Sequence, residues 1–177
     1  MLFRSKGGAR LAGQRAIADL AHVLESLFEA LSLERIAVGD DAVRVATSAH
    51  DGLATMVIDL RHNGHSKSAP ALISMVQEFI SRAQTATSGP AVESEDDRIT
   101  GIDTGAELSL DELDIETVEL FIEEADEILH RTGEILGAWT GAAEDRSRLA
   151  ALQRDLHTLK GGARLASIRA VGDLAHE

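Results

Sequence analysis

A histidine, a lysine and two glycines lie close together near the end of the chain, at His157, Lys160, Gly161 and Gly162. A histidine nitrogen can act as a nucleophile, so an exposed His157 could accept a phosphoryl group. The ammonium of Lys160, one helical turn away, would stabilise phosphoryl oxygens. Each glycine costs a helix about 1 kcal/mol relative to alanine, so the pair indicates a surface kept open, for example to a large partner. The alternative is an ordinary solvated histidine on a helix.

The residues around His157 have the spacing of one buried helix face. They recur at steps of three and four positions: Leu149, Leu152, Leu156, Leu159, Ala163 and Ala166. Such spacing places side chains on one side of an α-helix. His157 is about 100° round the helix from Leu156 and is not part of this stripe. We therefore predict that a helix over residues 144–166 carries His157 outward, with Lys160 and Gly161 on the same side.

The composition favours helices packed on helices. Of the 177 residues, 44% are hydrophobic but only 3% are aromatic, and alanine and leucine dominate the apolar set, as is typical of helical proteins. We predict an all-α fold, an antiparallel helical bundle.

Charge and composition exclude several classes of function. The net charge of −13 repels phosphate backbones and anionic membrane surfaces, so we expect no nucleic-acid partner and no membrane. The absence of cysteine excludes disulfides, thiolate catalysis and cysteine-based zinc sites. No apolar run approaches the roughly 18 residues of a membrane span. The chain also has no glycine-rich nucleotide loop that we recognise, so we expect no bound ATP. We also expect no other cofactor and no metal.

The chain contains an internal repeat. Residues 2–22 match residues 156–176 at an offset of 154 positions, and the heptapeptide that begins at Lys6 is identical to the one that begins at Lys160. Such a repeat indicates tandem modules, and it explains the basic N-terminus better than a targeting peptide does. The first copy has Phe3 where the second has His157. Phe3 has no nucleophilic nitrogen, so only the second copy could accept phosphate.

The segment from His157 to Arg164 resembles the signature of histidine-phosphotransfer (HPt) domains, most closely those of chemotaxis-type histidine kinases and of the hybrid kinases that control type IV pili and twitching motility. The resemblance implies a cytoplasmic phosphorelay protein. It also implies His157 as the phosphorylated residue, Lys160 as its electrostatic partner and Gly161 as the small residue beneath a docking regulator. The partners would be a response-regulator receiver domain and a histidine kinase catalytic domain.

The same resemblance implies a role for Glu25. In HPt domains of the chemotaxis type, a glutamate on the next helix hydrogen-bonds the phosphorylatable histidine, and Glu25 occupies the matching position. Its counterpart in the second copy would be residue 179, whereas the sequence stops at Glu177. Glu25 would therefore have to serve His157 from the other copy.

The remaining periodicity predicts further helices. We expect a helix end over 1–12, a helix over 14–33, a third capped by Asp40 or Asp41 and ended at Asn63-Gly64, and a fourth that starts near Pro70. After a linker, Ser109, Asp111 or Asp114 would cap a fifth helix with Trp139 in the core; a break would follow at 141–143, and another helix would begin at Ile168. The predicted organisation is 1–82 as the C-terminal part of a first HPt-like module, 83–109 as a disordered acidic linker, and 110–177 as the N-terminal part of a second module.

The two parts would complement each other. Each alone would leave an apolar stripe in water, so we expect residues 14–82 to pack against 110–166 as one bundle. The same association between two chains would give a swapped homodimer.

Two other functions remain open at this point. One is a degenerate helical scaffold that binds proteins without phosphotransfer, which Phe3 suggests. The other is a carboxylate-bridged metal bundle, because Glu127 and His130 fit a Glu-x-x-His pattern. That site would need a second copy, and the sequence offers only Asp-x-x-His, at Asp19/His22 and Asp173/His176. We interpret His50, His62 and His65 as solvated surface or loop residues.

Overall fold

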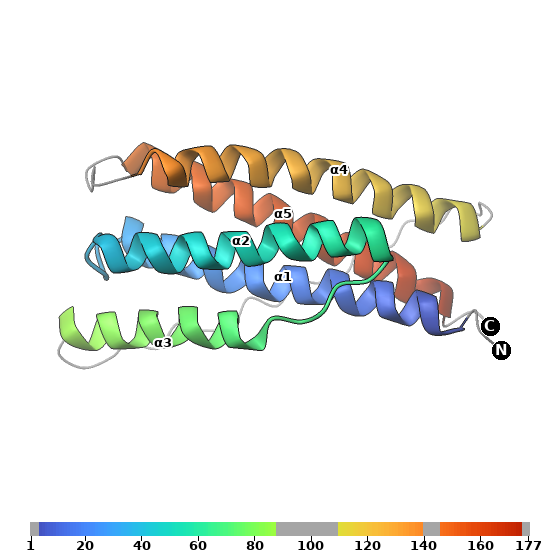
Figure 1. The fold of residues 1–177 in the computed structure, drawn as a ribbon, viewed down its shortest axis with the longest axis horizontal. Coiled ribbons are helices and arrows are strands. Elements are labelled where there is room, and N and C mark those ends of the chain that lie inside the picture. Colours follow the sequence, from blue (N-terminus) through green and yellow to red (C-terminus); the bar gives the residue numbers. More distant parts are fainter. Residues whose placement is uncertain (1–3, 88–109, 140–145, 175–177) are drawn as a thin grey trace.

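The computed structural model describes the backbone of residues 4–87, 110–139 and 146–174, and the side chains of residues 13–85, 117–139 and 148–166. This part of the chain forms five α-helices and contains no strand (Figure 1). The helices are α1 (Arg4–Ser32), α2 (Asp40–Asn63), α3 (Pro70–Thr87), α4 (Leu110–Gly137) and α5 (Arg146–Leu174). The all-α bundle predicted from composition is confirmed.

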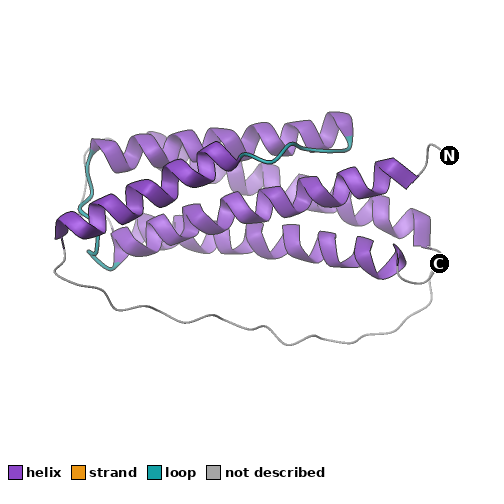
Figure 2. Ribbon diagram, turned by 90° about the horizontal axis from the view of Figure 1, so that it is seen from below, coloured by secondary structure: helices purple, strands orange, loops and turns teal. Residues whose placement is uncertain are grey.

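Four of the helices close into a ring. In the order α1, α5, α4, α2, each helix packs on its two neighbours, and α3 lies against α1 and α2. Neighbours round this ring run in opposite directions along a common long axis (Figures 1 and 2). The most extensive interface joins α1 to α5, so the first and last helices of the chain lie side by side.

The predicted stripes form the core. Leu24 of α1, Leu53 of α2 and Leu152 of α5 are each at most 1% exposed. Trp139, after the end of α4, is 2% exposed, and its ring centroid lies 6.1 Å from that of Phe28 on α1. The core placement predicted for Trp139 is confirmed. Because both parts of the chain supply these side chains, burial of one stripe depends on the other.

The ends of α2 agree only in part with those predicted from the sequence. Gly64 adopts a left-handed conformation with φ 68°, and its N–H donates to the Leu60 carbonyl, so the predicted end at Asn63-Gly64 is confirmed. The predicted aspartate cap is wrong, because Gly39 occupies the N-cap position and no side chain caps it. Asp40 and Asp41 lie instead in the first turn, where the helix dipole favours negative charge.

Two predicted helix boundaries are also wrong. Helix α1 runs unbroken through Gly13, and α5 continues past Ala166 to Leu174. Gly13 weakens a helix without ending it, because only proline also removes a hydrogen-bond donor. Here it allows close packing, since a Cβ on Gly13 would lie 2.7 Å from the backbone nitrogen of Ser66.

Helix α3 begins at Pro70 as predicted and ends at Thr87, so the first five residues assigned to the linker are helical. The linker from 88 to 109 and the break at 141–143 lie outside the described residues. So do the capping side chains predicted for α4, at Ser109, Asp111 and Asp114.

The helices of residues 14–82 and 110–166 build one bundle within a single chain. This is the arrangement expected for two complementary parts. None of the helices in the described ranges combines the length and the apolar character needed to cross a membrane.

Candidate functional site

His157 stands on the outer face of α5. Its side chain is 71% exposed, whereas Leu156 and Leu159 beside it are 0% and 1% exposed. The predicted outward orientation is therefore found, and it results from the helical period that turns the two leucines into the core.

Glu25 of α1 holds the imidazole ring from one side. Its Oε1 lies 2.8 Å from Nδ1 of His157, and its own side chain is only 13% exposed. Because a carboxylate accepts hydrogen bonds, Nδ1 carries the hydrogen in this contact. Nε2 of the neutral ring is then left with a free lone pair. The expected placement of Glu25 beside His157 is found.

Lys160 contacts the same carboxylate. Its Nζ donates to Oε2 of Glu25 at 2.5 Å, and its side chain is 14% exposed. The structure thus directs this ammonium at Glu25. Nδ1 of His22 also lies 3.9 Å from Oε2 of Glu25. Glu25 is the centre of a small network in which Lys160 holds the carboxylate and the carboxylate holds His157.

This network keeps Glu25 ionised. Burial by itself would raise the pKa of Glu25, but the hydrogen bonds from Lys160 and His157, together with their charges, outweigh burial and lower the pKa below the ordinary value of 4.5. The carboxylate is therefore negatively charged at neutral pH, as it must be to hold a hydrogen on Nδ1 of His157.

The two glycines of the motif have different surroundings. A Cβ on Gly161 would have open space around it, whereas a Cβ on Gly162 would lie 3.2 Å from Cδ2 of Phe121 on α4. Gly161 thus keeps the surface beyond His157 bare. The interpretation of Gly162 as a second access glycine is wrong, because its lack of a side chain serves the close packing of α5 on α4.

A pocket open to solvent lies beside the ring. Its lining, which we call the ring pocket, consists of Glu25, Ala150, Gln153, Arg154 and His157. Within it, Nε of Arg154 donates to the Ala150 carbonyl at 3.2 Å. Arg154 was not among the residues predicted for the site, although its position one turn before His157 was a usable signal.

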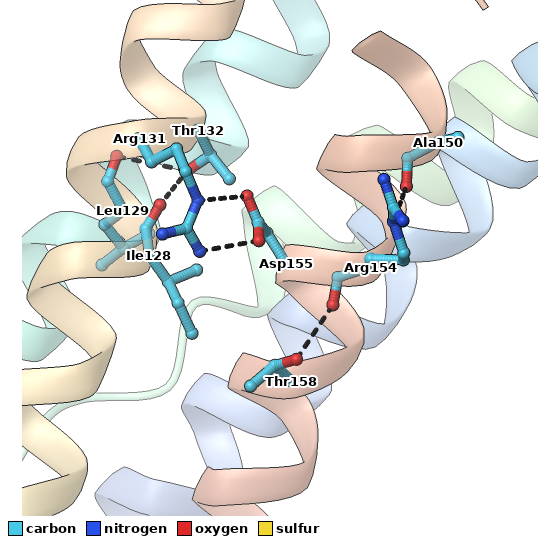
Figure 3. A network of polar contacts seen from close by, with 8 residues as sticks. All are labelled: Ile128, Leu129, Arg131, Thr132, Ala150, Arg154, Asp155 and Thr158. Carbon is cyan, nitrogen blue, oxygen red and sulfur yellow. Dashed lines mark hydrogen bonds and ion pairs between the residues drawn. The ribbon is translucent and has the colours of Figure 1, made fainter. Parts of the chain in front are cut away.

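An ion pair on the opposite side of α5 fixes this helix to α4. Nε and Nη2 of Arg131 donate to the two carboxylate oxygens of Asp155 at 2.9 and 2.7 Å (Figure 3). Hydrogen bonding to Asp155 raises the pKa of Arg131. Asp155 precedes His157 by two residues, so this paired contact helps to set the rotation of α5 that brings His157 outward.

The remaining histidines lie elsewhere. His62 and His65 are exposed as expected. The interpretation of His50 as a solvated residue is wrong: its side chain is 12% exposed, and Nε2 lies 2.9 Å from the Leu129 carbonyl oxygen. His50 is a packing residue between α2 and α4.

The metal alternative gains no support from the geometry. His130 is 80% exposed and has Glu134 as its carboxylate neighbour at 3.6 Å. Among the described residues, no group of three or more His, Asp or Glu side chains could hold a metal ion. Asp173 and His176 lie outside the described side chains.

The second part of the chain matches a known family of protein domains. Residues 116–177 match the family model of the Hpt domain. The match includes most of α4 and all of α5 with His157, and it supports an Hpt domain with a histidine phosphotransfer role in a phosphorelay. Hpt domains of this kind interact with receiver and kinase partners. No curated protein and no solved structure gave a significant match.

The Hpt match begins after Glu25. The contact between Glu25 and His157 therefore joins the Hpt segment to a helix from the other part of the chain.

Proposed function

We propose that this chain is a cytoplasmic histidine phosphotransfer module, in which His157 accepts a phosphoryl group and passes it to, or receives it from, the aspartate of a receiver domain. The observation that carries this proposal is the 2.8 Å contact between Nδ1 of His157 and Oε1 of Glu25 on a ring that is 71% exposed. This contact orients the ring and leaves Nε2 directed at an approaching donor.

In this chain, the ring of His157 and the carboxylate of Glu25 take part in the transfer. Nε2 attacks phosphorus, a P–N bond forms, and the P–O bond to the donor breaks with its electron pair on the leaving oxygen. The ring, which keeps its hydrogen on Nδ1, becomes positively charged, and the Glu25 carboxylate stabilises that charge. In the return step a receiver carboxylate attacks phosphorus, and the P–N electron pair goes back to Nε2.

Gly161 fits this role as the open surface for the partner. A receiver presents its aspartate within a protein surface, so the acceptor must stand where a second protein can approach closely. The exposed ring and the bare surface at Gly161 together meet that need. The resemblance of the motif further supports a chemotaxis-type or type IV pilus kinase as the system concerned, with a kinase catalytic domain as a donor.

Exchange with a phosphorylated receiver domain tests the proposal. The wild-type chain should acquire acid-labile phosphate, and His157→Gln should acquire none. His130→Gln is the matched control, because His130 is an even more exposed histidine on α4. If the wild type acquires no such phosphate, or if His157→Gln acquires as much, the chain is not a phosphotransfer module.

A second candidate is a helical interaction module without phosphotransfer. The observation in its favour is Phe3, which replaces the acceptor in the first copy of the repeat. Partner binding that persists in a chain without any histidine-bound phosphate would support this candidate.

A further inference from the structure

We propose that the guanidinium of Arg154, rather than the ammonium of Lys160, contacts the phosphoryl group carried by His157. This inference rests on the proposed function, because it assigns a cation to the phosphohistidine that the function requires. A phosphoryl group on Nε2 brings two negative charges to the surface of α5, and a nearby cation would stabilise them.

Lys160 is poorly placed for this task. Its ammonium lies 2.5 Å from Oε2 of Glu25, and its side chain is 14% exposed. To reach the phosphoryl group, it would have to give up its contact with a carboxylate whose side chain is only 13% exposed, and the loss of a partner from such a charge is costly. The geometry therefore assigns Lys160 to the support of Glu25.

Arg154 is the cation of the ring pocket. It precedes His157 by three residues, a spacing at which side chains on a helix are neighbours. Arg154 is exposed. Its guanidinium is turned back toward Ala150, and Nε donates a hydrogen bond to the Ala150 carbonyl (Figure 3). Within the described part of the chain, no carboxylate forms an ion pair with Arg154.

The chemistry of the guanidinium suits the ligand. Its planar fork of N–H donors can bind two phosphoryl oxygens at once, which an ammonium does not do. Only rotation of an exposed side chain is needed to bring it from the Ala150 carbonyl to a group on the ring. The cost of that movement is one hydrogen bond of 3.2 Å to a backbone oxygen.

The test loads the full chain with phosphoramidate, a small donor whose P–N bond breaks as Nε2 attacks phosphorus; its phosphoryl group is transferred to the ring and its amino group leaves as ammonia. Phosphorus NMR then follows the phosphoryl resonance as pH changes. A neighbouring cation favours the dianion, so it lowers the pKa of the phosphoryl group. We expect Arg154→Gln to raise that pKa by about half a unit. Arg154→Lys, which keeps the positive charge, should raise it by less.

Arg82→Gln is the matched control, since it removes the same charge from an exposed position on α3, a helix that packs on α1 and α2 in the described part of the chain. It should leave the phosphoryl pKa at the wild-type value. Circular dichroism verifies that each variant remains helical.

A wild-type phosphoryl pKa in Arg154→Gln would overturn the inference while leaving the proposed function intact. Absence of phosphohistidine from the wild type, or its presence in His157→Gln, would instead overturn the proposed function, and this inference with it.

Discussion

Glu25 and His157 lie 132 positions apart in the sequence, and their side chains meet at 2.8 Å across the interface between α1 and α5. A carboxylate from one part of the chain thus orients the ring of the other.

Removing the carboxylate should impair the acceptor. In Glu25→Ala the ring loses a charged hydrogen bond of a kind worth about 1.5–3 kcal/mol, so we expect the initial rate of His157 phosphorylation to fall roughly tenfold or more. The measurement is the initial rate of phosphohistidine formation, with the same donor at the same concentration for every variant. Glu29→Ala, an exposed position one turn along the same helix, is the control and should react at the wild-type rate. Equal rates for Glu25→Ala and wild type would remove Glu25 from the site.

The lowered pKa of Glu25 predicts a pH-dependent contribution to stability. The folded-state pKa lies below 4.5, so the contribution is complete above that value and is lost as pH falls through the folded-state pKa. Urea unfolding on both sides of pH 4.5 measures it. Glu25→Gln should lose less stability than wild type as the solution is acidified. The prediction fails if the two proteins lose the same free energy of unfolding over this range.

The two adjacent glycines should respond differently to alanine. Gly161→Ala adds a methyl group in open space and should stabilise the chain by about 1 kcal/mol through helix propensity. Gly162→Ala places a Cβ 3.2 Å from Phe121, so the clash should offset part or all of the same gain. Unfolding in urea compares the two variants. An equal gain at both positions would show that Phe121 moves aside freely.

The two parts of the chain should stay together after the connection is cut. The α1–α5 and α2–α4 interfaces join residues before 88 to residues after 109, and both parts contribute to the core. We expect a chain cut once between 88 and 109 to keep its helical circular dichroism and the mass of the uncut chain in native mass spectrometry. A segment 110–177 that folds stably by itself would contradict this, and an uncut chain with twice the expected mass would indicate a dimer, in which parts could be exchanged between two chains.

The fold could be predicted from local patterns to the extent that each pattern is complete within one segment. The spacing of Leu152, Leu156 and Leu159 defines a buried face without any knowledge of its partner. The Asn63-Gly64 helix end is likewise a local property, since glycine readily adopts the positive φ found there. Gly13 misled the prediction, because glycine resembles a boundary in sequence whether it ends a helix or admits a close neighbour.

The candidate site could be predicted only in part. Exposure of His157 follows from the helical period, and the place of Glu25 beside it followed from the resemblance to HPt domains of the chemotaxis type. The distinction between Gly161 and Gly162 could not be seen, because it depends on Phe121 in another helix. His50 was misread for the same reason, since the carbonyl it contacts is 79 positions away. The engagement of Lys160 with Glu25 is also a property of the assembled bundle.

The pairing of the first helix with the last has a consequence for how the protein matures. Contacts between residues far apart in sequence form slowly, because closing a long loop costs entropy before any contact offsets it. During synthesis, a ribosome-bound chain that has extended only as far as α4 contains Glu25 but does not yet contain His157. The contact between Glu25 and His157 can therefore form only when α5 has emerged and docked on α1.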